Sequence, residues 1–464
     1  MIPRYGVALV LTLLAASLPF WIRGEYALYV ATQFGVYVIV VMGLNVLAGF
    51  GGQISLGHGA FVGLGAYTAA LTMVNLHWSF WTAAGAAVMV SSIVGGLMAL
   101  PALRVSTWYL ALITLTFGQL FERMTVELSW LTNGFSGLAN IQRPQLFGHA
   151  LSDVQLYWLV AAIALAIALI VKNLVGSRLG RGLLAIRDNP EAAVSSGISV
   201  VGLKLFAFVF SAALAGLGGA LFAVQKTVIT PDDFTVDFSI FFLLVMVLGG
   251  SSRLWGPFTG MVAFFIVPEL LTGLQSWRMI IYGGVLLVLM TFAPNGLAGA
   301  IEAGFRRFAS RPRWPRRAGG AQGHPARELG TLDRIGGVPI VIKNIRKAFG
   351  GLAALDNVSL NIPAGESHAI VGPNGSGKTT LLNLISGFHK SDGGSMMSGA
   401  DNLLALAPHQ VARLGFGRTF QTPKLLNSVS AVENVMLGAF GIERSSIPEL
   451  LLQLPRACRS GEIS

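Results

Sequence analysis

Long apolar stretches recur along the first 300 residues of the chain, with short polar loops between them. A helix of about 20 residues crosses the hydrocarbon core of a bilayer, so each stretch is a candidate span. The pattern predicts about ten spans, at residues 6–20, 28–48, 58–74, 80–103, 107–124, 155–173, 202–224, 238–255, 257–272 and 279–297. No convincing small-residue cleavage site accompanies the N-terminal run, so we interpret it as the first span and not as a signal peptide.

The pattern changes after residue 300. Residues 301–337 are rich in Arg, Pro and Gly, and this composition predicts a basic, flexible linker that cannot bury a core. We favour a solvated tether over a specific binding role, and its charge would suit contact with anionic lipid. From residue 338 to 464, the sequence resembles a soluble α/β domain, in which polar and apolar positions alternate at 341–345 and 358–362 as in strands.

Composition supports a membrane location for most of the chain. Apolar residues make up 53% and charged residues 11%, against about 25% charged residues in soluble domains. The formal charge of +11 is concentrated in loops and in the linker, which fits membrane orientation and lipid headgroups better than nucleic acid. Cys458 is the only cysteine, which excludes an intrachain disulfide and a thiolate metal cluster.

The basic residues also predict an orientation. One set of alternate loops carries eight of them, and the other carries five together with most of the acidic residues. The eight are Arg4, Arg104, Lys172, Arg178, Arg181, Arg187, Lys204 and Arg253. Basic loops stay in the cytoplasm, and an even number of spans places residues 338–464 on that side. We therefore expect a multi-pass protein of the inner (plasma) membrane whose soluble domain is cytoplasmic.

A complete phosphate-binding loop of the form G-x-x-x-x-G-K-[ST] lies in the soluble domain. Residues 368–371 before it suggest the end of an apolar strand, and residues 380–385 after it suggest a helix. Backbone N–H groups and the positive end of the helix would hold the phosphates of ATP. Lys378 would reach the terminal phosphates, and the Thr379 hydroxyl would bind Mg²⁺. The predicted phosphate-binding residues are Gly372, Pro373, Asn374, Gly375, Ser376, Gly377, Lys378, Thr379 and Thr380.

Two other side chains are candidates at this site. Gln421 lies about forty residues downstream, where its amide could meet Mg²⁺ and the attacking water. A Phe-Gln pair in a loop means little by itself, but its distance from a phosphate loop gives it weight. Phe349, before the loop, could stack on adenine, or it could simply be an exposed aromatic residue on a turn.

The membrane part contains a glycine-rich stretch with polar insertions, from Gly49 to Gly65. It predicts either a broken helix beside a translocation path or close helix packing around satisfied polar groups. His58 has no second ligand at a usable spacing and is not a metal candidate. Glu269 is an intramembrane carboxylate and hence a weak functional candidate.

Residues 177–193 form a charged loop with helical character, which Asn189 and Pro190 interrupt. Its amphipathic pattern suits a surface helix that docks on a soluble partner. A helix that lies on the lipid surface is the alternative.

Together these motifs resemble two subunits of the Liv-type branched-chain amino acid ABC importer joined in one chain. Residues 43–58, 177–193, 248–257 and 294–297 are similar to its permease, and residues 349–351, 372–379 and 417–421 to its ATP-binding subunit. The resemblance implies a polytopic α-helical membrane domain followed by a partial α/β P-loop ATPase domain of the ABC type. It also implies a periplasmic amino-acid-binding protein, a second permease subunit and a second ATP-binding subunit as partners.

One departure from the family concerns catalysis. No Leu-Ser-Gly-Gly-Gln segment follows Gln421, and no carboxylate ends a run of four apolar residues after the phosphate loop. We therefore expect residues 338–464, the N-terminal part of an ATPase domain, to bind nucleotide weakly and to hydrolyse little. The alternatives are a scaffold that relies on a separate ATPase, and import of urea or short amides. An exporter, with fewer spans and long cytoplasmic helices, fits less well.

Overall fold

The structure, a computed structural model, describes residues 17–21, 24–102, 107–146, 148–270, 284, 287, 291, 296–308, 337–420, 424–426, 429–438 and 440. Contacts divide the chain into two compact units. The helical unit comprises the described residues up to Asp188 and those from Val200 to Phe308. The sheet unit combines Asn189–Ser199 with Ser310–Arg444.

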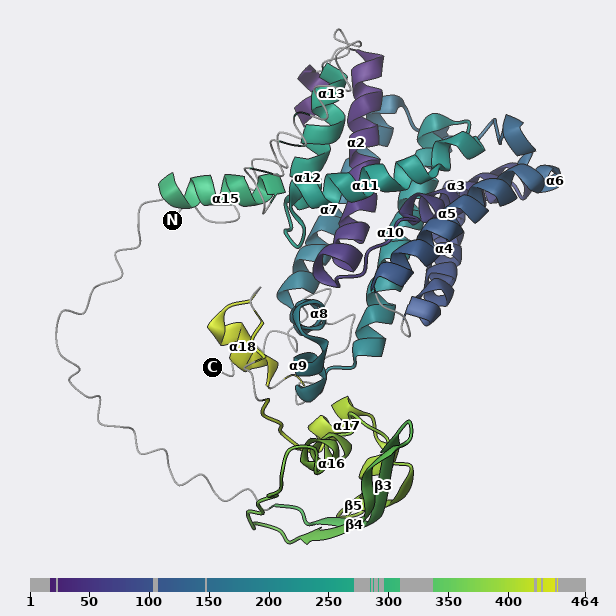
Figure 1. The fold of residues 1–464 in the computed structure, drawn as a ribbon. Helices are drawn as coiled ribbons and strands as arrows, with labels where there is room; N and C mark the ends of the chain where they lie inside the picture. The colour runs from purple at the N-terminus through teal and green to yellow at the C-terminus, as the bar shows by residue number, and fades with distance from the viewer. Residues whose placement is uncertain are drawn as a thin grey trace. The chain divides into compact units, whose positions relative to one another are not determined.

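Long apolar helices build the helical unit (Figure 1). They are α2 (Glu25–Leu44, extended by the π-helix η1, Asn45–Phe50), α3 (His58–Asn75), α4 (Phe80–Ala102), α5 (Thr107–Glu127), α7 (Asp153–Gly176), α10 (Val200–Lys226) and α11 (Val236–Gly250). A helix satisfies its own backbone hydrogen bonds, which an apolar segment in lipid requires. Shorter helices follow: α8 (Arg178–Asp188), α12 (Gly256–Met261), η4 (Val262–Ile266), α13 (Val267–Leu270) and α15 (Gly296–Phe308).

Helices occupy the predicted spans from 28–48 to 257–272, but the count of about ten is not confirmed. Five helices in the described part of the chain are long and apolar enough to cross a membrane. They are Glu25–Phe50, Phe80–Pro101, Asp153–Gly176, Val200–Lys226 and Pro231–Gly250. Polar and charged residues such as Glu122 and Arg123 dilute the hydropathy of α5. Span 279–297 and most of span 6–20 lie outside the described residues.

Helix α10 packs against α2, α3 and α4, and glycines set how closely it can approach. A Cβ atom on Gly65 of α3 would lie 2.3 Å from the Gly216 carbonyl oxygen, and one on Gly219 would lie 2.0 Å from that of Val62. Backbones in contact at such positions tolerate only glycine. The glycines of α3 and α10 therefore fix the centre of the bundle.

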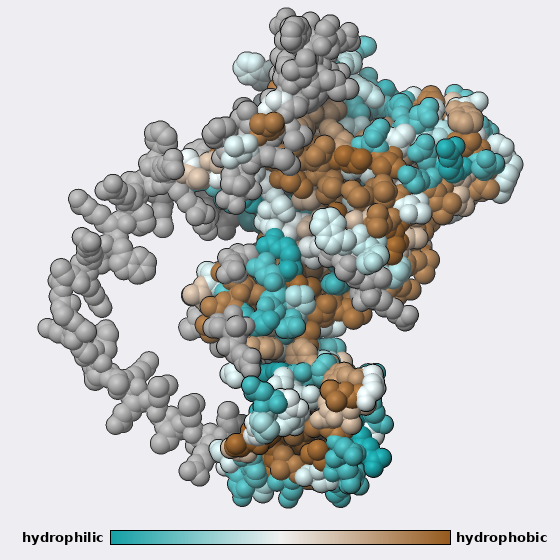
Figure 2. All heavy atoms as spheres, in the orientation of Figure 1, coloured by the Kyte–Doolittle hydropathy of each residue, from teal (hydrophilic) through white to brown (hydrophobic). Residues whose placement is uncertain are grey.

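The helical unit exposes much apolar surface, visible as brown side chains in Figure 2. On α4, Met89, Ile93, Leu97 and Leu100 are 64%, 57%, 58% and 53% exposed. Their spacing of three and four residues places them on one face of the helix. A soluble protein rarely carries such a stripe, so this face fits contact with lipid or with another membrane subunit.

The glycine-rich stretch contains a broken helix that is also closely packed, but its polar groups are not all satisfied. Gln53 Oε1 and Ser55 Oγ are buried without a hydrogen-bonding partner among the described residues. The wide π-turn η1 ends α2, and non-helical backbone then leads to α3 at His58. Asn45, Gln53, Ser55 and His58 are at most 3% exposed, and a Cβ atom on Gly57 would lie 2.0 Å from the Thr114 carbonyl oxygen. The helix is broken and the break is closely packed. A role beside the translocation path remains a prediction.

An antiparallel sheet in the order β4-β3-β5-β6 forms the sheet unit. Its strands are β3 (Ile340–Phe349), β4 (Leu352–Ile362), β5 (Gly393–Ser398) and β6 (Asp401–Asn402). The helices are α9 (Pro190–Ser195), α16 (Lys378–Ile385), α17 (Pro408–Arg413) and α18 (Ala431–Leu437). Ile342, Ile345, Leu355, Leu384 and Met396 lie in its core. The strands predicted at 341–345 and 358–362 are confirmed.

The strand predicted at residues 368–371 is wrong, because this segment has no regular structure. Val371 is 91% and Ile370 39% exposed. An apolar strand is stable when neighbouring strands and helices cover it, and no strand among the described residues pairs with this one. The linker prediction needs one adjustment as well. Helix α15 continues to Phe308, and residues 309–336 lie outside the described residues.

Candidate nucleotide site and the segment that contacts its domain

The phosphate loop has the backbone conformation that its glycines permit. Gly375 and Gly377 both have φ of +86°, which non-glycine residues rarely adopt. A Cβ atom on Gly377 would lie 2.5 Å from the carbonyl oxygen of Ala354 on β4. Helix α16 begins directly after this glycine, and Leu381 and Leu384 anchor it in the core. The loop is thus held between a strand and a buried helix.

The Lys378 ammonium group folds back on the loop. Its Nζ donates hydrogen bonds to the carbonyl oxygens of Gly372 (2.7 Å) and Pro373 (2.6 Å), and lies 3.3 Å from Ser376 Oγ. Phosphate oxygens would compete for the same three protons. Residues 372–376 and Thr379 are exposed, so anions can reach them. These features fit the binding of a nucleoside triphosphate. The assignment of the loop residues remains our prediction.

Phe349 lies at the end of β3, next to a tight turn in which Gly350 has φ of +57°. Its ring is 46% exposed and meets the His389 ring edge-on at 5.3 Å. In the sheet register Phe349 pairs with Leu352, two residues before Ala354, which Gly377 contacts. Phe349 and Gly377 thus lie beside neighbouring positions of β4, and stacking of Phe349 on adenine stays a prediction.

A carboxylate that the sequence did not single out supports this corner. Asp392 accepts hydrogen bonds from Lys347 Nζ and from the backbone N–H of Ala348, both at 2.7 Å. The bond from Lys347, together with that from Ala348, lowers the pKa of the Asp392 carboxyl below its usual value. Lys347 Nζ also lies 5.4 Å above the Phe349 ring. The pair is 45 residues apart, and no spacing rule would have revealed it.

The structure describes one of the two proposed magnesium ligands. Thr379 lies in the first turn of α16, as predicted, whereas Gln421 lies outside the described residues. The guanidinium of Arg418, three residues before it, lies over the Phe388 and Phe420 rings, 5.1 and 5.3 Å from their centroids. Within the described ranges no cluster of three His, Cys, Asp or Glu side chains could hold a metal ion. Thr379 and Gln421 as magnesium ligands stay a prediction.

The loop at 177–193 divides into two helices where the sequence predicted a break. Asn189 Oδ1 accepts a hydrogen bond from Ala192 N at 3.1 Å, and Pro190 follows as the first residue of α9. This N-cap begins a new helix.

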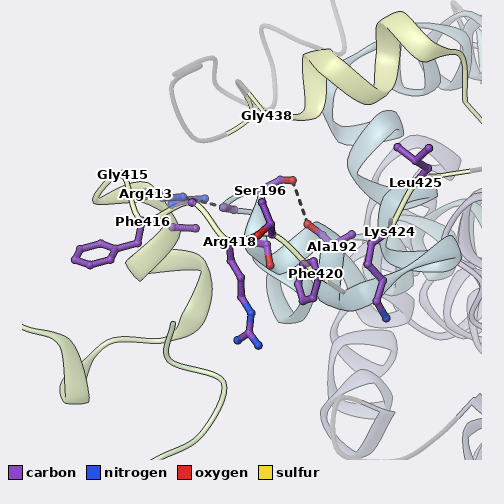
Figure 3. A pocket seen from close by; sticks show the side chains of 15 residues that line it. Ala192, Ser196, Arg413, Gly415, Phe416, Arg418, Phe420, Lys424, Leu425 and Gly438 are labelled. Atoms are coloured by element: carbon purple, nitrogen blue, oxygen red, sulfur yellow. Dashed lines mark hydrogen bonds between the residues drawn. The ribbon is translucent and has the colours of Figure 1, made fainter. Parts of the chain in front are cut away.

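Helix α9 contacts the soluble domain within the sheet unit. Arg413 Nε donates to the Gly197 carbonyl at 3.0 Å, and Lys424 pairs with Glu191 at 3.0 Å. Figure 3 shows the cleft of about 710 Å³ that Ala192 and Ser196 form with the segment from Arg413 to Lys424. Docking on a soluble domain is thus confirmed for α9, and the domain belongs to the same chain.

Glu269 has a hydrogen-bonding partner in the helical unit, because the Tyr26 hydroxyl of the α2 region donates to it. This contact gives the carboxylate a structural role. A functional role for Glu269 is untested.

These features define a membrane permease that is joined to a P-loop nucleotide-binding domain. Residues 26–290 match the branched-chain amino acid transport system / permease component family, and residues 355–459 match the ABC transporter family. The chain therefore belongs to the branched-chain amino acid transport system permease family and carries an ABC transporter domain after it.

Individual relatives match either the permease part or the ATP-binding part of the chain. LivM of Salmonella typhimurium, a high-affinity branched-chain amino acid transport system permease protein, is 32% identical over 258 residues, which cover 50% of this chain and 61% of LivM. A probable branched-chain amino acid transport ATP-binding protein LivG of Archaeoglobus fulgidus is 38% identical over 99 residues, or 21% of this chain and 38% of LivG. LivG of Escherichia coli is 34% identical over 114 residues, or 25% and 45%. The chain thus spans three fifths of the permease relative and less than half of these ATP-binding relatives.

Proposed function

We propose that the chain is the permease and nucleotide-binding component of an ABC importer for branched-chain amino acids. One observation carries this proposal: the domain with the phosphate loop contacts α9, which lies between two membrane helices in the sequence. Nucleotide binding in such a domain can act on the permease through this loop. The names of the LivM and LivG relatives support branched-chain amino acids as the cargo.

The proposed cofactors are ATP and Mg²⁺. Backbone N–H groups of Gly372 and of residues 374–377 bind the phosphates, Lys378 binds the terminal ones, and Phe349 stacks on adenine. Pro373 has no N–H group and shapes the loop. Thr379 and Gln421 hold Mg²⁺, which neutralises phosphate charge when bound. The proposed partners are a periplasmic amino-acid-binding protein, a second permease subunit and a second ATP-binding subunit. The complex lies in the inner membrane with its ATP-binding domains in the cytoplasm.

A second candidate function has specific support. Residues 368–371 have no strand partner in the described sheet, and the sequence lacks a Leu-Ser-Gly-Gly-Gln segment. Both facts favour a scaffold that binds nucleotide and depends on a separate, complete ATPase for hydrolysis. The transport role of the helical unit is the same in both candidates.

Uptake in cells that lack their own branched-chain transporter tests the proposal. The cells would express the chain with its proposed partner subunits, and labelled leucine and labelled urea would be compared. We expect leucine uptake that Lys378→Ala lowers at least about tenfold, the loss expected for a group that contacts phosphate. Uptake of urea in place of leucine would contradict the proposal that branched-chain amino acids are the cargo. Uptake that Lys378→Ala leaves unchanged would favour the scaffold.

A further inference from the structure

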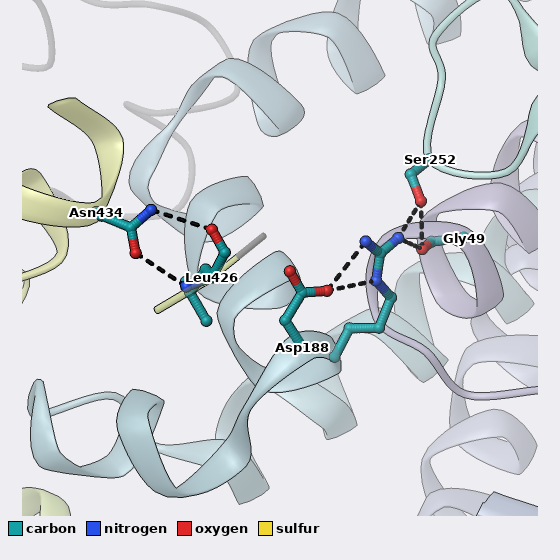
Figure 4. Close-up of polar contacts among 6 residues, drawn as sticks. Gly49, Asp188, Ser252, Leu426 and Asn434 are labelled. Atoms are coloured by element: carbon teal, nitrogen blue, oxygen red, sulfur yellow. Dashed lines mark hydrogen bonds and ion pairs between the residues drawn. The ribbon is translucent and has the colours of Figure 1, made fainter. Parts of the chain in front are cut away.

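Three segments of the helical unit meet at one carbonyl oxygen, that of Gly49 at the end of the π-helix η1. It accepts hydrogen bonds from Arg187 Nη1 at 2.8 Å and from Ser252 Oγ at 2.7 Å. The Arg187 guanidinium also donates to Ser252 Oγ. Figure 4 shows this arrangement. Arg187 belongs to the last turn of α8, and Ser252 belongs to the turn between α11 and α12.

The position of Arg187 matches what the end of a helix needs. The last carbonyl groups of a helix have no partners within it and carry partial negative charge. A wide π-turn also displaces the usual bonding pattern: the N–H groups of Gly51, Gly52 and Gln53 bond to Val46, Ala48 and Leu47. Arg187 therefore places a cation on the negative end of the α2–η1 helix and caps it.

Glycines beside this contact leave the space that it requires. A Cβ atom on Gly52, which has φ of +68°, would lie 2.6 Å from Arg187 Cγ. A Cβ atom on Gly49 would lie 2.2 Å from Asn45 Oδ1. Without a side chain at either position, the arginine stem and the Asn45 amide can both reach the turn.

Further contacts hold the two partners of the Gly49 carbonyl in place. Asn45 Oδ1 accepts from Ser252 N at 3.0 Å, and its Nδ2 donates to the Arg253 carbonyl at 2.9 Å. Asp188 Oδ1 accepts from Arg187 Nε and Nη2, both at 3.1 Å. The guanidinium is therefore oriented on one edge by a carboxylate and bonded on the other to the membrane helix.

We propose that Arg187 is a positioning residue that links the loop Asn189–Ser199 to the break in the α2–η1 helix, so that a displacement of the loop reaches this helix. Only Asp188 separates Arg187 from Asn189, the N-cap of α9, which contacts the nucleotide-binding domain. The inference rests on the proposed function for its purpose, because a link between this loop and a membrane helix serves ATP-driven transport. Its physical content needs no nucleotide.

Hydrogen exchange of the Gly51, Gly52 and Gln53 amides in the full chain tests the cap. Loss of a charge-assisted hydrogen bond in Arg187→Gln should raise their exchange about tenfold. Ser252→Ala should raise it less, and Arg187→Lys should restore part of the protection. Arg181→Gln is the matched control, because Arg181 lies on the same helix and bonds to the Gly176 carbonyl at 3.4 Å. Unchanged exchange in Arg187→Gln would overturn the proposal.

A double-mutant cycle tests the transmission. The pair Glu191→Lys and Arg413→Ala removes two contacts of the loop within the sheet unit. In the otherwise native chain we expect this pair to change exchange at residues 51–53 by at least about threefold, and by much less when Arg187→Gln is also present. An equal response in both backgrounds, or none in the native one, would overturn the link. The cycle is measured without ATP, so a failure of nucleotide binding would contradict the proposed function alone.

Discussion

The Lys378 ammonium group donates hydrogen bonds to its own loop. A bound phosphate must replace those hydrogen bonds. Removing the side chain should therefore weaken ATP binding more than it affects folding, because its charge lies next to an exposed loop. We expect Lys378→Ala to weaken ATP binding at least about tenfold, as for other charge-assisted contacts. Titration of the full chain with a fluorescent ATP analogue measures the affinity.

Lys343 provides the control for that measurement. It is an exposed lysine on β3 in the same unit, so Lys343→Ala removes the same charge at a distance from the loop. Its affinity should match that of the native chain. Equal weakening by both substitutions would show that general electrostatics, and not the phosphate loop, determines binding.

Asp392 predicts an acid-dependent loss of order at the Phe349 corner. Its pKa is lowered in the folded state by Lys347 and by the Ala348 N–H. The stabilisation from this group is therefore present above the pKa of the unfolded state, about 4. It is lost as the pH falls through the lower pKa of the folded state. In Asp392→Asn we expect the backbone amides of this corner to be less protected from hydrogen exchange at pH 7. Acidification should then reduce their protection less than it does in the native chain.

Hydrogen exchange in β3 and β5 checks this prediction, since residues 338–464 contain no tryptophan to report unfolding by fluorescence. Asp356→Asn is the control, because the Asp356 side chain is 78% exposed and lies 3.5 Å from Arg346. If hydrogen exchange in Asp392→Asn depends on pH as it does in the native chain, the role assigned to the carboxylate is wrong.

The sequence was informative about residues whose roles depend on near neighbours. The spacing of glycines, Lys378 and Thr379 predicted a loop whose conformation follows from those residues. Asp392 with Lys347, and Arg187 with Gly49, join residues far apart in the chain. Their contacts arise from strand pairing and helix packing, which one sequence does not reveal. The role of Gln421 stays a prediction.

At the scale of the elements, the glycines between α3 and α10 give a direct test of packing. A Cβ atom on Gly65 would lie 2.3 Å from a backbone oxygen of α10. Gly65→Ala should therefore push the helices apart and cost about 1–3 kcal/mol of stability. Thermal unfolding of the purified protein in detergent measures the loss.

Gly85 of α4 is the matched position, because a Cβ atom there would meet nothing within 4 Å. Gly85→Ala should be neutral or stabilising by up to about 1 kcal/mol, since alanine favours helices. If both substitutions behave alike, the close approach of α3 and α10 does not limit stability.

Hydrophobic pattern predicted the elements well where an element forms by itself. Helices occur at the apolar runs from 28–48 to 257–272, because each can satisfy its own backbone bonds. Alternation at 341–345 predicted β3, which has both β4 and β5 as partners. The apolar segment 368–371 misled the prediction, because a strand depends on neighbours. Strand β5 was missed, because its sequence, Gly-Gly-Ser-Met-Met-Ser, lacks the β-branched residues that mark strands.

For the whole molecule, the permease region and the ABC transporter domain belong to one chain. Two parts of one chain meet at a high effective concentration. Within the sheet unit, modest contacts between α9 and the nucleotide-binding domain are then sufficient to keep these two parts together. Lys424 with Glu191 is a contact of this modest kind, because exposed ion pairs contribute only about 0–1 kcal/mol. Arg413 adds one hydrogen bond to the Gly197 carbonyl.

We predict that residues 338–464 bind ATP but hydrolyse little of it by themselves. The phosphate loop and Lys378 are the proposed binding groups, whereas residues 338–464 contain neither the signature segment nor a strand-end carboxylate to polarise water. Loss of a single stabilising group in an active site commonly costs about 10²–10³ in rate. We therefore expect phosphate release by the purified chain to increase at least about a hundredfold when a complete LivG-type subunit is added. Lys378→Ala in this chain and the corresponding lysine substitution in the added subunit would show which loop each rate depends on. Steady turnover by the chain alone that Lys378→Ala abolishes would contradict the prediction and show that residues 338–464 hydrolyse ATP themselves.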